Sequence, residues 1–216
     1  DTNTVANNYF YRLRIGVWFR GSLTNPNDNN TITGNLVGPT SFGPDQIGRA
    51  GIVVQHQNNL GVTLNEVRFV GGDLANSPAI TADRVGIGLG SDSWPATQTF
   101  VLNSTITRNK VHDIVDERGT SAVGIIFAAQ YAVTNSNNTL ANNMVYNVRS
   151  NASTAGKQTV GIAISYGRTD RIVYNSVLLT GDLDPVGTAD ATQSAVGIRI
   201  SASAVLNLTL RDNISS

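Results

Sequence analysis

The feature that most constrains the fold of this chain is a glycine that returns at a nearly constant interval. The repeated glycines are Gly16, Gly51, Gly86, Gly124, Gly161 and Gly197, so they advance by 35, 35, 38, 37 and 36 residues. Each begins or interrupts a short run of apolar residues, as at 51–54 and 124–127. A period of this length indicates a repeat protein, in which each unit buries its apolar residues against the next unit.

A second motif alternates with the first and reads Thr-(Val/Ile/Leu)-x-x-Asn-x-(Val/Phe). It is clear at 4–10, 31–37, 105–111 and 139–145, and weaker elsewhere. Its asparagines are Asn8, Asn35, Asn65, Asn109, Asn143, Asn175 and Asn213. Asn tolerates the left-handed backbone region better than most residues, so the motif predicts a sharp corner in each repeat. Asparagines at equivalent corners can also hydrogen-bond from one repeat to the next.

Each repeat contains three short strands: one with the glycine motif, one with the Thr motif, and one that follows the asparagine. Strands this short bury too little surface alone, but they share a continuous core when they stack in parallel. We predict an all-β fold, a right-handed parallel β-helix (a solenoid) of about six turns of roughly 36 residues, with three short strands per turn. A tetratricopeptide-like helical repeat has a similar length, but the β-branched strands and frequent glycines disfavour it.

Composition supports a single domain over residues 1–216 and argues against a nucleic-acid partner and against membrane insertion. Hydrophobic residues make up 40% and charged residues 14%, which is enough apolar material for a core. The 15 basic and 15 acidic residues cancel, so no nucleic-acid partner is expected. There is no Cys, and no apolar run approaches the roughly 18 residues of a membrane helix, so no membrane insertion is expected. Because the sequence begins and stops within the repeat pattern, we expect a portion of a longer protein.

The alternating glycine and asparagine motifs resemble the parallel β-helix repeats of the pectate-lyase-like superfamily and of other bacterial surface proteins. In particular, they are similar to the Asn-rich, Cys-free repeats of large secreted proteins of the Bacteroidetes and Ignavibacteria type. The resemblance covers nearly the whole chain. It implies the architecture and an extracellular or cell-surface location in a bacterium. It implies no single activity, because this solenoid serves lyases, hydrolases, adhesins and stalks alike.

The candidate binding surface is formed by irregular segments that precede the glycine strand in successive repeats, at 38–49, 71–84, 116–121, 149–159 and 180–194. Equivalent insertions stack on one edge of a solenoid, and binding residues gather on such loops. The candidate ligand-binding residues are Arg84, Asp92, Trp94, Asp116, Glu117 and Arg118. Trp94 offers a ring that can stack on a sugar, whereas the charged residues suit a solvated salt-bridge network or, alternatively, a calcium site or an acid/base pair.

No catalytic residue, metal-ligand set or cofactor is predicted. A hydrolase on this fold needs two or three converging carboxylates, and a lyase needs calcium-binding carboxylates with a basic residue. The motifs Asn-Thr-Asp, Asp-Asp and Gly-His-Gly are absent from the sequence. His56 and His112 lack metal-ligand spacing and are interpreted as outward-facing polar residues of strands.

The sequence therefore favours a structural or adhesive role, as an extracellular rod segment of a bacterial surface or filament-forming protein with lateral loops as its interaction face. The expected partners are adjoining repeats or further copies stacked end to end, because terminal turns leave open strand edges. The alternative is a polysaccharide lyase or hydrolase, or a carbohydrate-binding module, on the same fold.

Overall fold

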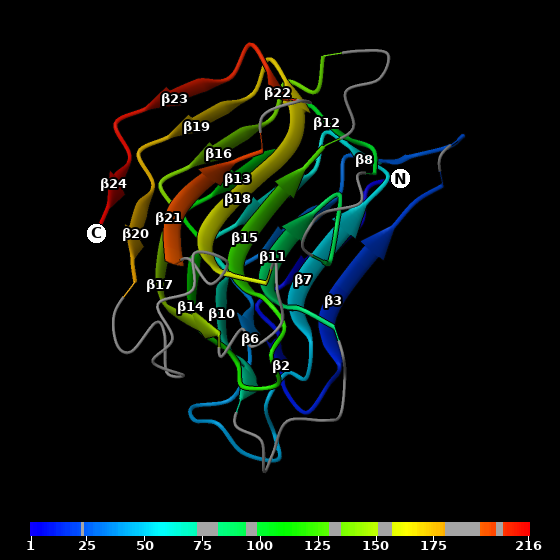
Figure 1. Ribbon diagram of the computed structural model, residues 1–216. Coiled ribbons are helices and arrows are strands. Elements are labelled where there is room, and N and C mark those ends of the chain that lie inside the picture. Colours follow the sequence, from blue (N-terminus) through cyan, green and yellow to red (C-terminus); the bar gives the residue numbers. More distant parts are fainter. Residues whose placement is uncertain are drawn as a thin grey trace.

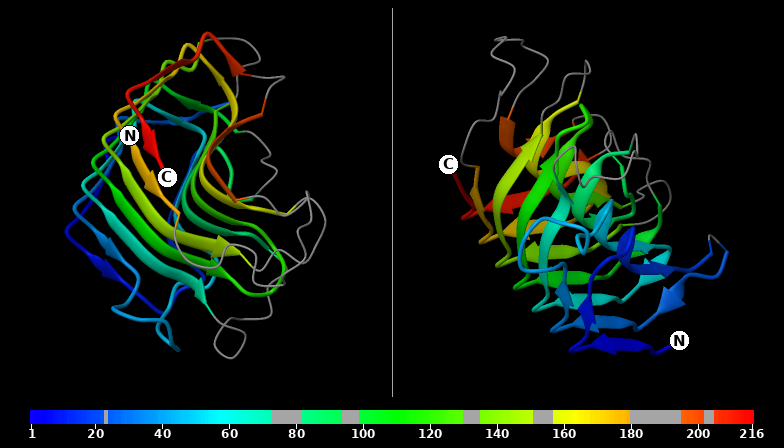
Figure 2. Two further views of the ribbon diagram at one scale, coloured as in Figure 1. Left: turned by 60° about the vertical axis from the view of Figure 1, so that its left-hand side comes forward. Right: turned by 90° about the horizontal axis from the view of Figure 1, so that it is seen from below.

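The computed structural model describes residues 1–22, 24–72, 82–93, 99–129, 135–150, 157–179, 195–201 and 205–216. Within these residues the chain forms strands, turns and bends that wind as an all-β parallel β-helix (Figure 1). The N-terminus and the C-terminus lie at opposite ends of the stack of turns (Figure 2). The described part of the chain includes no helix that is long and apolar enough to cross a membrane.

Three parallel sheets form the sides of the coil, and the chain visits them in the same order in successive turns. Sheet A contains β1 (Thr4–Ala6), β5 (Thr31–Thr33), β9 (Gly61–Thr63), β13 (Thr105–Thr107), β16 (Thr139–Ala141), β19 (Arg171–Val173) and β23 (Thr209–Arg211). Sheet B contains β2 (Tyr9–Phe10), β6 (Leu36–Val37), β10 (Glu66–Gly72), β14 (Lys110–Asp116), β17 (Met144–Ser150), β20 (Ser176–Leu178) and β24 (Ile214–Ser215). Sheet C contains β3 (Ile15–Arg20), β7 (Ala50–Gln55), β11 (Arg84–Leu89), β15 (Ala122–Ala128), β18 (Thr159–Arg168) and β21 (Ala195–Ile200).

A fourth, short sheet follows sheet C in the first turns. It contains β4 (Asn27–Asp28), β8 (Gln57–Asn58) and β12 (Val101–Leu102). Near the C-terminal end, β22 (Val205–Leu206) pairs with the end of β18. These strands extend the three-strand turn predicted from the sequence.

The core lies inside the coil because equivalent apolar residues pair from turn to turn. In sheet A, Ile32 pairs with Val62, and in sheet B, Val67 pairs with Val111. All four side chains are fully buried in one continuous apolar cluster that also receives the inward residues of sheet C. Burial of apolar area supplies the main driving force for this stacking, since no single turn encloses a core.

The outer face of sheet C is buried as well. Val53, Val85, Val123, Ile126 and Val160 are fully buried, and they form a second apolar cluster outside the coil. Segment 90–93 contributes to this cover, because a Cβ added to Gly88 would lie 2.1 Å from the carbonyl oxygen of Ser91. Sheet C is therefore packed on both faces, as its nearly continuous apolar sequence requires.

The corner between sheets A and B differs in one respect from the sequence prediction. The left-handed residue is the one before the repeated asparagine, as at Asn7 (φ 55°), Leu64 (φ 59°) and Tyr174 (φ 57°). The repeated asparagine itself does not have a positive φ in any turn. The prediction that this asparagine supplies the left-handed conformation is therefore wrong. Its recurrence has another cause, which is its side-chain amide.

The repeated asparagines form an internal hydrogen-bonded column, which we call the asparagine ladder. It consists of Asn8, Asn35, Asn65, Asn109, Asn143, Asn175 and Asn213. At Asn109 the backbone N–H and Nδ2 both donate to Oδ1 of Asn143, each at 3.0 Å, and Nδ2 also donates to the carbonyl of Val62 at 2.9 Å. The other steps of the ladder repeat this arrangement. Buried amides of this kind are stable only when their hydrogen-bonding groups are satisfied.

The repeated glycines lie where sheets B and C approach closely. A Cβ added to Gly124 would lie 2.3 Å from Cγ1 of Val145 and 2.6 Å from the carbonyl oxygen of Gly161. The same two kinds of contact surround Gly16, Gly51, Gly86 and Gly161, and a side-chain atom of Ser215 replaces the valine at Gly197. These positions require glycine because there is no space for a side chain, so the period of the glycines reflects the spacing of the turns.

Candidate functional site

The predicted charged cluster is partly assembled, but its centre is buried. Arg84 on β11 and Asp116 at the end of β14 approach within 3.5 Å, and neither side chain is exposed. Asp116 also accepts hydrogen bonds from the backbone N–H groups of Arg118 and Thr120, at 3.2 and 2.6 Å. Burial lowers the pKa of Arg84, against the opposing effect of the Asp116 and Asp83 carboxylates. This pair holds the loop after β14 against β11, and no ligand at the surface reaches it in this conformation.

Other charged groups extend this cluster across neighbouring turns. Asp83 accepts a hydrogen bond from the N–H of Ser121 at 2.9 Å and forms an ion pair with Lys157, also at 2.9 Å. Glu117 lies further out and pairs with Arg149 at 3.0 Å, where both side chains are partly exposed. The cluster is thus a salt-bridge network that links three successive turns at the corner between sheets B and C.

Two predicted ligand-binding residues, Asp92 and Trp94, remain. Asp92 follows β11 and pairs with Arg49 at 2.9 Å. Trp94 lies outside the described residues. Within the described ranges, no group of three or more His, Asp or Glu side chains is arranged to hold a metal ion.

The outer face of sheet B carries a second cluster, centred on His112, which is not among the predicted ligand-binding residues. His112 on β14 lies with Nε2 2.9 Å from Oε1 of Glu66 and Nδ1 2.5 Å from Oδ2 of Asp113. A histidine ring donates at both nitrogens only in its doubly protonated form. Asp113 has a positive φ of 54°, which bends β14 and turns its carboxylate towards the histidine, and it also accepts a hydrogen bond from Asn147.

Aromatic rings enclose His112 along the axis of the coil. Its ring stacks on Tyr146 with centroids 4.6 Å apart and planes 3° apart, and it meets the edge of Phe69 at 6.1 Å. Phe69 in turn contacts Phe42 from the loop that follows β6. As a result His112 is only 5% exposed, and the exposed groups of the cluster are Glu66 and Lys110. His112 thus faces outward from its strand, as predicted, but these rings cover it.

Glu66 is surrounded by cationic and donor groups. Lys110 and Arg68 each lie 3.3 Å from Oε1, in addition to His112. Partial burial alone would raise the pKa of Glu66, but the hydrogen bonds from His112 and Lys110 and the charges of Lys110 and Arg68 hold it below its usual value. A hydrogen bond with Tyr146 raises the pKa of Lys110. Glu66 is therefore an ionised, partly exposed acceptor at the surface of sheet B.

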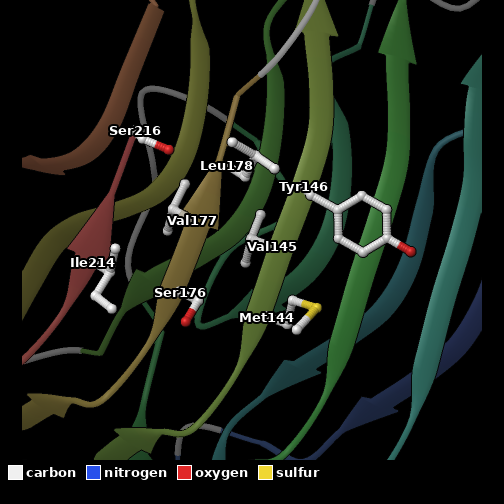
Figure 3. Close-up of a pocket in the computed structure, with 8 residues that line it drawn as sticks. All are labelled: Met144, Val145, Tyr146, Ser176, Val177, Leu178, Ile214 and Ser216. Carbon is white, nitrogen blue, oxygen red and sulfur yellow. The ribbon is translucent and has the colours of Figure 1, made fainter.

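A hollow of about 400 Å³ lies next to this cluster, towards the C-terminal end of sheet B. Its walls come from Met144 and Tyr146 on β17, Leu178 on β20 and Ile214 on β24, and the small side chain of Ser176 lies between them (Figure 3). Met144, Leu178 and Ile214 are 51%, 48% and 69% exposed. The outer face of sheet B thus changes from a charged region at Glu66 to an apolar hollow at Ser176.

The carboxylates with shifted pKa values are not placed for acid/base catalysis. A glycosidase requires a general acid with a raised pKa that reaches the substrate. Glu66 is accessible, but its pKa is lowered. Burial raises the pKa of Asp170 to about 6, yet its side chain is 1% exposed. Neither of these two carboxylates therefore combines an accessible position with a raised pKa.

The fold defines the class of protein, which is the all-β parallel β-helix. No protein-family model, no curated protein and no solved structure matches this chain significantly.

Proposed function

We propose that this chain is a structural and adhesive rod segment of an extracellular bacterial surface protein, related to the pectate-lyase-like β-helices and to the secreted repeats of the Bacteroidetes and Ignavibacteria type. The asparagine ladder and the buried apolar column support this role, because they give the coil a continuous, hydrogen-bonded and closely packed interior. Adjoining repeats or further copies stacked end to end are its proposed partners.

The observation that carries this proposal is the second apolar cluster, on the outer face of sheet C. Its residues are fully buried although they lie outside the coil. Three contacts hold the segments that flank sheet C against it. The Ser91 carbonyl packs on Gly88 of β11, Asp92 pairs with Arg49, and Asp116 pairs with Arg84 of β11. Loops held on one side of a stiff solenoid form a lateral interaction face, as in other repeat proteins.

A second candidate function is carbohydrate binding at the outer face of sheet B. Binding sites commonly combine apolar and aromatic walls with a few polar groups. The hollow supplies Tyr146, Met144 and Leu178 as apolar walls, and Glu66 and Lys110 supply the polar groups one or two turns away. A pyranose ring has an apolar C–H face and a rim of hydroxyl groups that suit such a surface. An active lyase or hydrolase is the less favoured alternative.

These functions are separated by one set of assays on the purified chain with a panel of soluble polysaccharides. Retention by a polysaccharide and release of reducing or unsaturated sugars are measured in parallel. We expect retention without release. Release of sugars would overturn the non-catalytic proposal, and absence of retention on every polysaccharide would refute carbohydrate binding.

Two pairs of variants locate the binding face. Ser176→Phe fills the hollow, and Thr33→Phe places the same ring on the outer face of sheet A as a control. Trp94→Ala tests the loop side, and Trp18→Ala removes an exposed ring at the N-terminal end of sheet C as its control. Loss of retention with Ser176→Phe alone supports sheet B, and loss with Trp94→Ala alone supports the loops.

The structural role is tested by electron microscopy and by antibody labelling. Rods that lengthen with protein concentration would support end-to-end association. An antibody raised against the chain should label the outside of intact cells that produce the protein. Labelling only after permeabilisation would overturn the surface location.

A further inference from the structure

The hollow on the outer face of sheet B has a serine at its floor and apolar side chains on three sides. Ser176 lies between Met144 of β17 and Ile214 of β24, which are its neighbours in the register of the sheet (Figure 3). Leu178, two residues further along β20, forms the third side, because residues two apart on a strand share a face. Ser176 is exposed, so its hydroxyl is accessible to a ligand.

The size of the hollow limits its occupant to a small group. Its volume of about 400 Å³ is near the lower end of the range of small-molecule sites, about 300–1,000 Å³. A stable protein–protein interface takes about 800 Å² and about 20–30 residues from each partner. The apolar side chains around Ser176 provide a small part of that area, and the charged pair of Lys110 and Glu66 follows them along the sheet. The hollow therefore fits a sugar unit with its substituent better than the surface of a second copy.

The charges next to the hollow balance one another, which favours a neutral ligand. Lys110 and Arg68 each lie 3.3 Å from Oε1 of Glu66. Asp113 adds a second carboxylate, which faces the ring of His112. Two carboxylates thus accompany two cationic side chains, and a highly charged polymer of either sign would meet like charges here. Neutral hydroxyl groups, in contrast, can accept from Lys110 and donate to Glu66.

An acetamido group matches both the floor and the walls of the hollow. Its methyl group gains free energy by contact with apolar side chains such as Met144 and Ile214. Its N–H donates and its carbonyl accepts, and the hydroxyl of Ser176 can pair with either. A hydroxyl substituent would place a polar group against the apolar walls, whereas a bare methyl group would offer Ser176 no hydrogen bond.

The spacing of the turns fits a sugar chain that runs along the axis of the coil. Lys110, Met144 and Ser176 are successive members of one outward row of sheet B. Neighbouring strands are about 4.8 Å apart, so Lys110 lies about 10 Å from Ser176. An extended β-linked sugar chain advances by nearly the same length per unit. With one unit over Ser176, the unit two further along therefore reaches Lys110.

We propose that the hollow over Ser176 binds the acetamido group of a neutral polysaccharide built from 2-acetamido sugars. This inference rests on the proposed carbohydrate binding at the outer face of sheet B, and it names the substituent that this face recognises. The methyl group lies between Met144 and Ile214, and the amide hydrogen-bonds to Ser176. Hydroxyl groups of a unit further along the chain contact Lys110 and Glu66.

Three tetrasaccharides with the same backbone and the same β linkage provide the test. They are the tetramers of N-acetylglucosamine, glucosamine and glucose, which differ only in the acetamido, amino or hydroxyl group on the second ring carbon. Isothermal titration calorimetry gives their dissociation constants for the purified chain. Burial of one methyl group and the gain of one hydrogen bond together correspond to about 10-fold in affinity. We expect the acetylated tetramer to bind at least about 10-fold more tightly than the other two, and more tightly than the acetylated disaccharide, which is too short to join Ser176 to Lys110.

Two variants link this preference to the hollow. Ser176→Ala removes the hydroxyl and should reduce the preference for the acetylated tetramer over the glucose tetramer by about 2- to 10-fold. Met144→Gln keeps the length of one wall but makes it polar, and should reduce the preference as well. Thr105→Val is the control, because it removes an exposed hydroxyl from the outer face of sheet A and should change none of the constants. Thermal unfolding checks that each variant folds, and the comparison of the three tetramers on the wild type needs no variant.

The failure of this inference is distinct from the failure of carbohydrate binding. Equal affinity for the acetylated and glucose tetramers would overturn the inference and leave carbohydrate binding in place. Retention by another polysaccharide that is lost with Ser176→Phe, without binding of the acetylated tetramer, would do the same. Absence of binding to every tetramer and every polysaccharide would refute both. Concentration-dependent dimers that Ser176→Phe abolishes would assign the hollow to a second copy and also overturn the inference.

Discussion

Removal of a single amide from the middle of the asparagine ladder should destabilise the protein far more than the same change at its end. In Asn109→Ala, Oδ1 is lost as the acceptor of the Asn65 N–H at 3.0 Å, and Nδ2 is lost as the donor to the Val62 carbonyl at 2.9 Å. Both partners lie in the interior, so each becomes an unsatisfied buried group. Each such group costs about 1–3 kcal/mol, which gives an expected loss of about 2–6 kcal/mol.

Asn8→Ala is the matched control, because Asn8 occupies the exposed end of the same ladder. Its Nδ2 donates to Asn35 and to the carbonyl of Ala6, where water can replace the lost bonds. We expect a loss below about 1 kcal/mol. Asn109→Asp is a second test, because it keeps the shape of the side chain but replaces the donor with an acceptor that faces the Asn143 oxygen.

Urea unfolding measures these differences, and hydrogen exchange shows where they act, since repeat proteins often unfold in parts. Faster exchange should be confined to the turns that contain Asn65, Asn109 and Asn143. Equal losses for Asn109→Ala and Asn8→Ala, within about 0.5 kcal/mol, would refute the reasoning that the ladder stabilises the interior through satisfied buried amides.

Three further results are expected. In thermal unfolding, Gly124→Ala should destabilise the protein by about 1–3 kcal/mol or more, because its Cβ would overlap Val145 and the Gly161 carbonyl. Gly61→Ala should be nearly neutral in the same assay, because the nearest neighbour of its Cβ would lie at 3.9 Å. Asp116→Ala should lower the free energy of unfolding by about 3–5 kcal/mol, because it leaves the Arg84 charge buried without its partner. Glu117→Ala, at the partly exposed pair with Arg149, should lower it by less than about 1 kcal/mol. Similar losses for the two variants in urea unfolding would contradict the burial argument. Ser176→Phe should leave stability nearly unchanged because the ring enters an open hollow, and a large drop in melting temperature would show that the hollow is filled.

The architecture could be predicted from the sequence because its causes are local and periodic. A glycine that must pack against a valine of the next turn has to recur once per turn, whatever the loops between do. The asparagines also recur once per turn, because each one hydrogen-bonds to the asparagine of the next turn. These ladder partners lie 27 to 44 residues apart in the sequence. The backbone role assigned to them was wrong because the residue before each asparagine supplies the positive φ, and that position varies from Asn7 to Leu64 and Tyr174.

The partners of His112 in the neighbouring turns were not predicted because the turns differ in length. Glu66 and Lys110 are 44 residues apart, since a long insertion separates them, yet they pair directly in sheet B. The sequence did contain an indication of this pairing. Glu66 follows the ladder residue Asn65 and Lys110 follows Asn109, so both occupy the same outward-facing row of sheet B. The burial of Arg84 and Asp116 had no such signal, since a charged residue at the first or last position of a strand has the same sequence pattern whether it is exposed or enclosed.

The asparagine ladder also gives the β-helix a chemical direction. Every side-chain oxygen in it accepts from the preceding turn, so the amide dipoles point the same way from Asn8 to Asn213 and reinforce one another. At the Asn8 side the ladder presents an acceptor, and at the Asn213 side it presents a backbone donor. Any further turn that continues the ladder, from this chain or from another copy, must therefore join in one orientation. A symmetric junction of two like ends would place oxygen against oxygen or donor against donor.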